Sequence, residues 1–213
     1  MINISTVIKE IVEEDEIILE MLRADMLNLS SYARSIHKEV EKRSFKEVKL
    51  KSLIVSLSRF AKQYPQEENN LPLKLDTLSV HVNLVDLSYE KTKGNLIRTE
   101  KLMKLFTQKE TFFTLVQGIT EITIIADTSL IAETKHLFEG ENPLSEMADL
   151  VGITVKSDVI YTQIPGQFYS LLHCFKVKKI NIIEIVSTST EITFVIDKKD
   201  IQLAISQLSK FLV

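Results

Sequence analysis

Two stretches of the sequence nearly repeat each other: Val116-Gln-Gly-Ile-Thr-Glu-Ile-Thr-Ile-Ile-Ala-Asp127 and Val186-Ser-Thr-Ser-Thr-Glu-Ile-Thr-Phe-Val-Ile-Asp197. They lie 70 residues apart, and the first valine, the run Thr-Glu-Ile-Thr and the final aspartate coincide. Both are rich in β-branched residues, which favours strands. The same spacing sets Asn95-Leu-Ile-Arg98 over Pro165-Gly-Gln-Phe168. The repeat therefore predicts two copies of one supersecondary unit.

Each copy shows the same order of predicted elements. An extended, alternating stretch (78–89, then 151–163) precedes a helix with an apolar stripe (96–107, then 167–178). Two strands follow (111–117 and 121–126, then 181–187 and 191–196), and a last helix begins after Asp127 or Asp197. The order βαββα, twice, predicts two ferredoxin-like modules of the α+β class, 76–145 and 146–213, each an antiparallel sheet with helices on one face.

The N-terminal part of the chain is predicted to be a separate helical domain, residues 1–64. Apolar residues recur at helical spacing on one face: Leu50, Leu53, Ile54, Leu57, Phe60, Ala61 and Tyr64. A preceding helix starts near residue 29, with Asn28 or Ser30 as its cap, and two more are expected at 5–13 and 16–25. Polar and turn-favouring residues then predict a linker at 65–75.

The segment Ile164-Pro-Gly-Gln-Phe-Tyr-Ser-Leu-Leu172, followed by the strands from Ile180 to Asp200, resembles the regulatory ACT domains at the C-terminus of aspartate kinases. The resemblance covers about residue 151 to the end, and the first repeat is similar but degenerate. It implies modules that pair side by side into larger sheets and bind an amino-acid effector against a partner's second strand. The implied ligand-binding residues are Gln163, Ile164, Pro165, Gly166, Gln167, Asn181 and Ile182. Asn95-Leu96 departs from this pattern, which argues against a second site in the first repeat.

The Pro-Gly pair has a physical meaning apart from the resemblance. Pro165 fixes one turn dihedral, and Gly166 lets the backbone approach a ligand closely. A helix that begins at Gln167 then offers free N–H groups and a positive dipole end, which suit a carboxylate. The competing interpretation is an ordinary turn before a helix.

Charge gathers in the helical domain. Residues 28–64 carry nine bases against three acids, the footprint of a nucleic-acid binder. In a helix-turn-helix or winged-helix interpretation, the outward face of the last helix approaches DNA, and two lysines before it contact phosphates. These residues are Lys51, Ser52, Ser56, Arg59 and Lys62, with Lys46 and Lys49. The alternative is a dimerisation or docking unit whose basic face is solvated or pairs with the acidic segment 13–20.

Composition argues against several other classes. Five scattered glycines build no phosphate-binding loop, the four histidines stand apart, and Cys174 has no metal-binding neighbours. We therefore expect no catalytic residues, no metal and no cofactor, and a cytoplasmic homodimer without a membrane segment. The sequence predicts a non-catalytic regulatory protein that senses an amino acid and acts as a transcription regulator. The alternatives are a docking subunit of a biosynthetic enzyme and an assembly module without a ligand.

Overall fold

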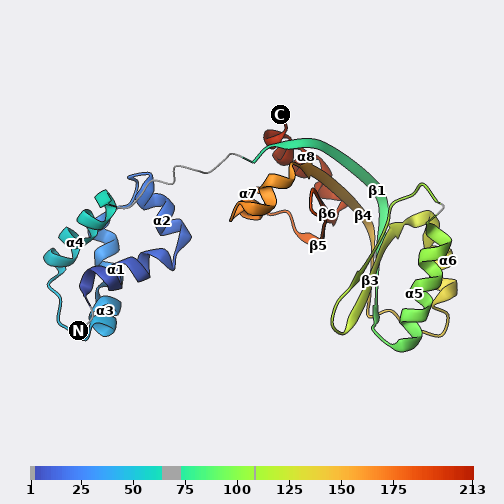
Figure 1. Ribbon diagram of the computed structural model, residues 1–213, viewed down its shortest axis with the longest axis horizontal. Coiled ribbons are helices and arrows are strands. Elements are labelled where there is room, and N and C mark those ends of the chain that lie inside the picture. The colour runs from blue at the N-terminus through green and yellow to red at the C-terminus, as the bar shows by residue number, and fades with distance from the viewer. Residues whose placement is uncertain (1–2, 64–72, 108) are drawn as a thin grey trace. The chain divides into compact units, whose positions relative to one another are not determined.

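The computed structural model describes residues 3–63, 73–107 and 109–213, which form two compact units (Figure 1). The first lies within residues 1–71 and contains helices α1 (Ile4–Glu13), α2 (Glu16–Arg23), α3 (Leu29–Ser44) and α4 (Leu50–Gln63). The second lies within residues 72–213 and contains one six-stranded sheet with its helices. We call them the helical unit and the sheet unit.

The helical unit closes around the apolar faces that the sequence predicts. Polar side chains cap three helices: Asn3 caps α1, Asp15 caps α2, and Asn28 rather than Ser30 caps α3 by accepting from the Ser31 N–H. Leu53 and Leu57 of α4 are fully buried, and Leu50, Ile54, Phe60 and Ala61 pack against the same core. Tyr64, the last predicted member of this face, lies outside the described residues.

The sheet unit has six antiparallel strands in the order β2-β3-β1-β4-β6-β5. They are β1 (Leu75–Glu90), β2 (Phe113–Gln117), β3 (Glu121–Asp127), β4 (Ser145–Ser157), β5 (Ile182–Ser187) and β6 (Glu191–Asp197). Helices α5 (Lys93–Phe106) and α6 (Ile131–Leu137) belong to the first repeat, and α7 (Gln167–Val177) and α8 (Ile201–Leu208) to the second. The predicted order βαββα, twice, is confirmed.

The two copies match down to single hydrogen bonds. The hydroxyls of Ser88 and Thr123 are 2.9 Å apart in the first copy, and those of Thr154 and Thr193 are 2.7 Å apart in the second. Asp127 accepts from the Ser129 N–H and Asp197 from the Lys199 N–H. The Val116 and Val186 stretches thus form the same hairpin and the same helix start, as the repeat predicts.

The repeat spacing is not uniform, which corrects one sequence expectation. Leu84 pairs with Asp127 on β3, and Leu150 pairs with Asp197 on β6. The first strands are therefore 66 residues apart, whereas the hairpins are 70 apart. The alignment of Asn95 with Pro165 is wrong, because extra residues enter the second copy between its first strand and its helix.

The two long first strands exchange their ends. The last part of β1 pairs with β3 of its own repeat, while its first part, 75–81, pairs with β4 of the other repeat. In return, the start of β4 pairs with residues 86–88 of β1. Each repeat by itself has three strands, and the other repeat supplies its fourth. The predicted division at 145/146 therefore does not separate two independent sheets.

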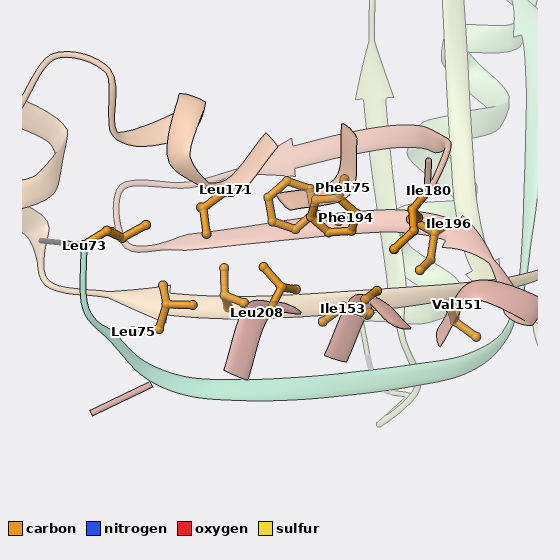
Figure 2. Packing of buried hydrophobic residues seen from close by; sticks show 12 residues of the cluster. Leu73, Leu75, Val151, Ile153, Leu171, Phe175, Ile180, Phe194, Ile196 and Leu208 are labelled. Carbon is orange, nitrogen blue, oxygen red and sulfur yellow. The ribbon is translucent and has the colours of Figure 1, made fainter. Parts of the chain in front are cut away.

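The start of β1 is also part of the hydrophobic core of the second repeat. Leu73 and Leu75 pack in one cluster with Leu171, Phe194 and Leu208 (Figure 2). Leu75 is fully buried. The linker expected at 65–75 thus ends earlier, since Leu73 already contributes to the core; residues 65–72 lie outside the described part. Helices α5 to α8 cover this face of the sheet, and in the described part of the sheet unit none of these four helices packs on the opposite face.

We predict that Leu75→Ala destabilises the second repeat although the residue belongs to the first by sequence. Removing a fully buried leucine costs roughly 2 to 5 kcal/mol. Amide hydrogen exchange should therefore accelerate in β4 and β6 more than in β2. Val80→Ala is the control on the same strand, because Val80 is 37% exposed. Accelerated exchange confined to β2 and β3 would contradict the strand exchange.

Candidate functional site

The candidate site is the connection between β4 and α7, residues 158–166. The extended stretch expected to reach Gln163 ends at Ser157, and a short 3-10 helix, η2 (Val159–Gln163), follows. The cause is local, since the Asp158 carboxylate accepts a hydrogen bond from the Ile160 N–H at 2.9 Å and turns the chain. Gly166 follows with φ +81°, a left-handed conformation that favours glycine. We call residues 158–166 the effector loop.

The N-terminus of α7 is open toward this loop. Gly166 stands at the cap position, so no side chain caps the first turn, whereas in the first repeat Thr92 caps α5 by accepting from the Asn95 N–H. The Tyr169 N–H bonds to the Gly166 carbonyl. The N–H groups of Gln167 and Phe168 therefore point out of the helix with the positive end of its dipole. Such an end accepts a carboxylate.

The effector loop and the first turn of α7 expose large apolar side chains and contain a single carboxylate. Val159, Ile160 and Phe168 are 55%, 50% and 54% exposed. Asp158 is the only Asp or Glu between Ser157 and Cys174. The arrangement offers two N–H groups, one carboxylate and an apolar surface within one short segment.

The residues expected to bind a ligand do not all meet within one chain. Gln163, Ile164, Pro165, Gly166 and Gln167 form the end of the effector loop, as expected. Asn181 and Ile182 lie at the start of β5, where Ile182 is level with Ile196 and hence with Val151. That level is six residues from Ser157 along β4, about 20 Å. A site built from both groups therefore requires a second copy or another module.

The equivalent connection in the first repeat is closed. β1 ends at Glu90, and α5 begins at Lys93 after only two residues. Asn95 is 1% exposed; its side-chain amide donates to the Glu90 carbonyl at 2.9 Å, and its oxygen accepts from Arg98. Arg98 in turn pairs with Glu141 at 3.2 Å. In the first repeat, the side chains of Asn95 and Arg98 therefore occupy the strand–helix junction, which is an open loop in the second repeat.

Sequence reasoning missed two residues of the effector loop, Asp158 and Tyr161. The sequence pattern places both in the extended stretch 151–163. Tyr161 packs against the core of the second repeat, and its hydroxyl accepts from the Lys74 N–H at 3.1 Å. Asp158 does indicate a turn from the sequence alone, because Asp is depleted in strands and favours turns. The link from Tyr161 to Lys74 spans 87 residues and has no local signal.

The opposite face of the sheet buries a carboxylate. Asp86 of β1 is 4% exposed, and burial raises its pKa to about 6, with a further contribution from the charge of Glu184 on β5. The Ser88 hydroxyl at 3.5 Å opposes this shift only weakly. Burial, with the charge of Glu121, also raises the pKa of Glu184.

Within the described residues no group of three His, Cys, Asp or Glu side chains is arranged to hold a metal ion.

We predict that Asp86→Asn stabilises the sheet unit at pH 7.5 and loses this advantage toward pH 4. A carboxyl whose folded-state pKa lies above the unfolded value binds its proton more tightly when folded, so its stabilising effect is lost as the pH rises through about 6. The difference at pH 7.5 should be on the order of 2 kcal/mol. Urea unfolding at both pH values measures it. Exposed Asp76 on the same strand is the control, and an Asp76→Asn effect of equal size would refute the assignment.

The predicted nucleic-acid residues form an exposed surface of the helical unit. Lys46, Lys49, Lys51, Ser52, Arg59 and Lys62 are exposed, and Ser56 is half-buried. None of the five cations makes an ion pair with another residue of the described segments. The acidic segment 13–20 pairs with a different base of the same basic stretch, as the alternative expects in part, since Glu14 bonds to Arg43 at 2.6 Å. The turn before α4 also exposes Phe45, which is 86% exposed and has φ +55°.

Comparison with known proteins shows a shared fold without a matching sequence family. No family model matches the sequence, and no curated protein matches it. The structure is similar to aspartate kinase from Clostridium acetobutylicum, with 10% identity and a TM-score of 0.54 over 68% of this chain. The chain spans 37% of that enzyme.

Two smaller structures match almost over their whole length. The regulatory subunit of aspartate kinase from Thermus thermophilus has a TM-score of 0.51 at 10% identity, over 64% of this chain and 97% of that chain. The subunit from Thermus flavus has a TM-score of 0.52 at 10% identity, over 65% and 98%. The predicted ACT-like fold with ferredoxin-like modules is confirmed. In the described part of the chain, no helix is long and apolar enough to cross a membrane.

Proposed function

We propose that this chain is a non-catalytic regulatory protein that binds a free amino acid at the effector loop. The observation that carries the proposal is the uncapped start of α7 behind Gly166, within a fold that aspartate kinase regulatory subunits share. In the first repeat Thr92 caps the equivalent helix, and Asn95 is buried with its amide on the Glu90 carbonyl, so the described residues show this opening in the second repeat alone. One effector per chain follows.

Each part of an amino acid finds a matching group at the loop. Its carboxylate accepts from the N–H groups of Gln167 and Phe168, where the helix dipole favours negative charge. Its ammonium group faces the Asp158 carboxylate, and its side chain contacts the apolar surface of Val159 and Ile160. A second copy of the chain contributes Asn181 and Ile182 of its β5, which makes the binding species a homodimer.

We predict that one of the twenty amino acids raises the melting temperature of the full chain. A ligand at 100 times its dissociation constant stabilises by about 2.7 kcal/mol. Gly166→Ala should abolish this shift, because a methyl group at φ +81° strains the loop that presents the α7 N–H groups.

Gly140→Ala is the matched control. Gly140 has φ +85°, and neither glycine has an atom within 4 Å of the added methyl group, so both changes impose a similar backbone strain. The Gly140 variant should keep the ligand shift. Loss of the shift in both variants, or a screen of the wild-type protein without any shift, would refute the amino-acid site.

We propose that the helical unit binds DNA and that the protein regulates transcription in this way. The favouring observation is the exposed α4 stripe of Lys51, Arg59 and Lys62, which lacks ion pairs within the described residues. Helix α4 has 14 residues and is about 21 Å long, a length that fits the major groove. Docking on a biosynthetic enzyme is the alternative output, and an assembly role without a ligand is the other.

We predict that the full chain binds a mixed-sequence 30-base-pair duplex with strong salt dependence. Between 50 and 200 mM salt the affinity should fall by at least tenfold, because phosphate contacts release counterions. Lys51→Glu with Arg59→Glu should abolish binding measured by fluorescence anisotropy. Lys101→Glu with Lys104→Glu on exposed positions of α5 is the charge-matched control. Equal loss in both variants, or binding that ignores salt, would contradict a DNA surface on α4.

A further inference from the structure

The chain enters the sheet unit through a clamp of three residues, Leu73 to Leu75. Leu73 is 9% exposed and Leu75 is fully buried in the core of the second repeat. Leu75 pairs with Ser157 at the end of β4, and its carbonyl accepts from the Val213 N–H at 3.3 Å. We call residues 73–75 the entry clamp. Every described contact named here comes from the second repeat, although the clamp leads into β1 of the first repeat in sequence.

Tyr161 joins the entry clamp to the effector loop. It lies in the middle of η2, and its ring packs against the same cluster as Leu73 and Leu75. Its hydroxyl accepts a hydrogen bond from the Lys74 N–H at 3.1 Å. Its carbonyl accepts from the Ile164 N–H at 3.3 Å, one residue before Pro165. Tyr161 therefore bonds to the entry clamp through its side chain and to the end of the effector loop through its carbonyl.

The segment that carries Tyr161 is weakly held. A five-residue 3-10 helix has poor hydrogen-bond geometry, and Val159, Ile160, Thr162 and Gln163 around Tyr161 are exposed. Segments with few buried contacts open at low free-energy cost. Tyr161 is the one residue of η2 for which the described part of the chain shows packing against the core cluster.

We infer that Tyr161 couples the effector loop to the entry clamp, so that a ligand on the loop tightens the hold on residues 73–75. The effect of the ligand rests on the proposed function, whereas the mechanical link does not. A ligand that fixes the loop around Gly166 also fixes η2, and η2 orders the clamp through the Tyr161 hydroxyl. Coupling between two sites is reciprocal, so loosening the clamp must loosen the loop. The clamp is the first described segment after the helical unit in sequence.

The link is tested first without any ligand. Tyr161→Phe in the full chain removes only the hydroxyl and should speed hydrogen exchange at the Lys74 amide about fivefold, the factor for a lost hydrogen bond of about 1 kcal/mol. Tyr89→Phe is the matched control, because Tyr89 stacks on Phe138 in the core of the first repeat, and it should leave Lys74 unchanged. In the reverse direction, Leu73→Ala should speed exchange at the Ile164 amide, whereas Val80→Ala should not. Unchanged exchange at Lys74 in Tyr161→Phe would overturn the coupling.

The second arm adds a mixture of the twenty amino acids at 1 mM each. In the wild-type protein the mixture should slow exchange at Lys74, and in Tyr161→Phe it should slow exchange in the loop but not at Lys74. A raised melting temperature with unchanged exchange at Lys74 would overturn the coupling and leave the proposed function standing. An unchanged melting temperature would refute the proposed function, and the ligand-free arm alone would then decide the link.

Discussion

The antiparallel pairing of β1 with β4 is the interaction on which the sheet unit depends. Leu84 and Leu150 are equivalent residues of the two repeats and pair directly with each other, so an approximate two-fold axis passes between them. On either side of this point each strand leaves its own repeat and completes the sheet of the other. A three-stranded βαββα unit would expose the edge of its first strand, and unpaired edges favour non-specific association. The exchange covers both edges at once and makes the two repeats one folding unit.

This shared sheet allows the two repeats to differ at one end without loss of the fold. The first repeat connects strand and helix through Lys91 and Thr92 and seals the junction with the buried Asn95. In the second repeat nine residues connect the strand to the helix, and no side chain caps the N-terminus of α7. The hydroxyl pairs that join the first strand of each repeat to its third strand, Ser88 with Thr123 and Thr154 with Thr193, are equivalent. Equivalent scaffolds therefore carry one closed and one open junction.

Local patterns predicted the elements well, because they act over a few residues. The repeated Thr-Glu-Ile-Thr strands, the helix starts after Asp127 and Asp197, and the described part of the apolar face of α4 all formed as expected. The exchange of β1 and β4 ends escaped sequence reasoning, since alternation shows that a strand exists but not which strand it pairs with. The same limit applies to Leu73, which looked like part of a linker, and to Tyr161, whose hydrogen-bond partner is 87 residues away.

The candidate site could be predicted only in part, because only its local features have a signal in the sequence. The Pro165-Gly166 turn and the helix start at Gln167 are local, and both are present. Asn181 and Ile182 came from resemblance, and they lie at the other end of the sheet. Amide NMR of the full chain, titrated with single amino acids, tests most directly whether the open start of α7 receives a carboxylate. One amino acid should move the Gln167 and Phe168 signals while Gly94 and Asn95 at the closed junction stay fixed; equal movement at both junctions, or none at α7, would contradict a carboxylate site there.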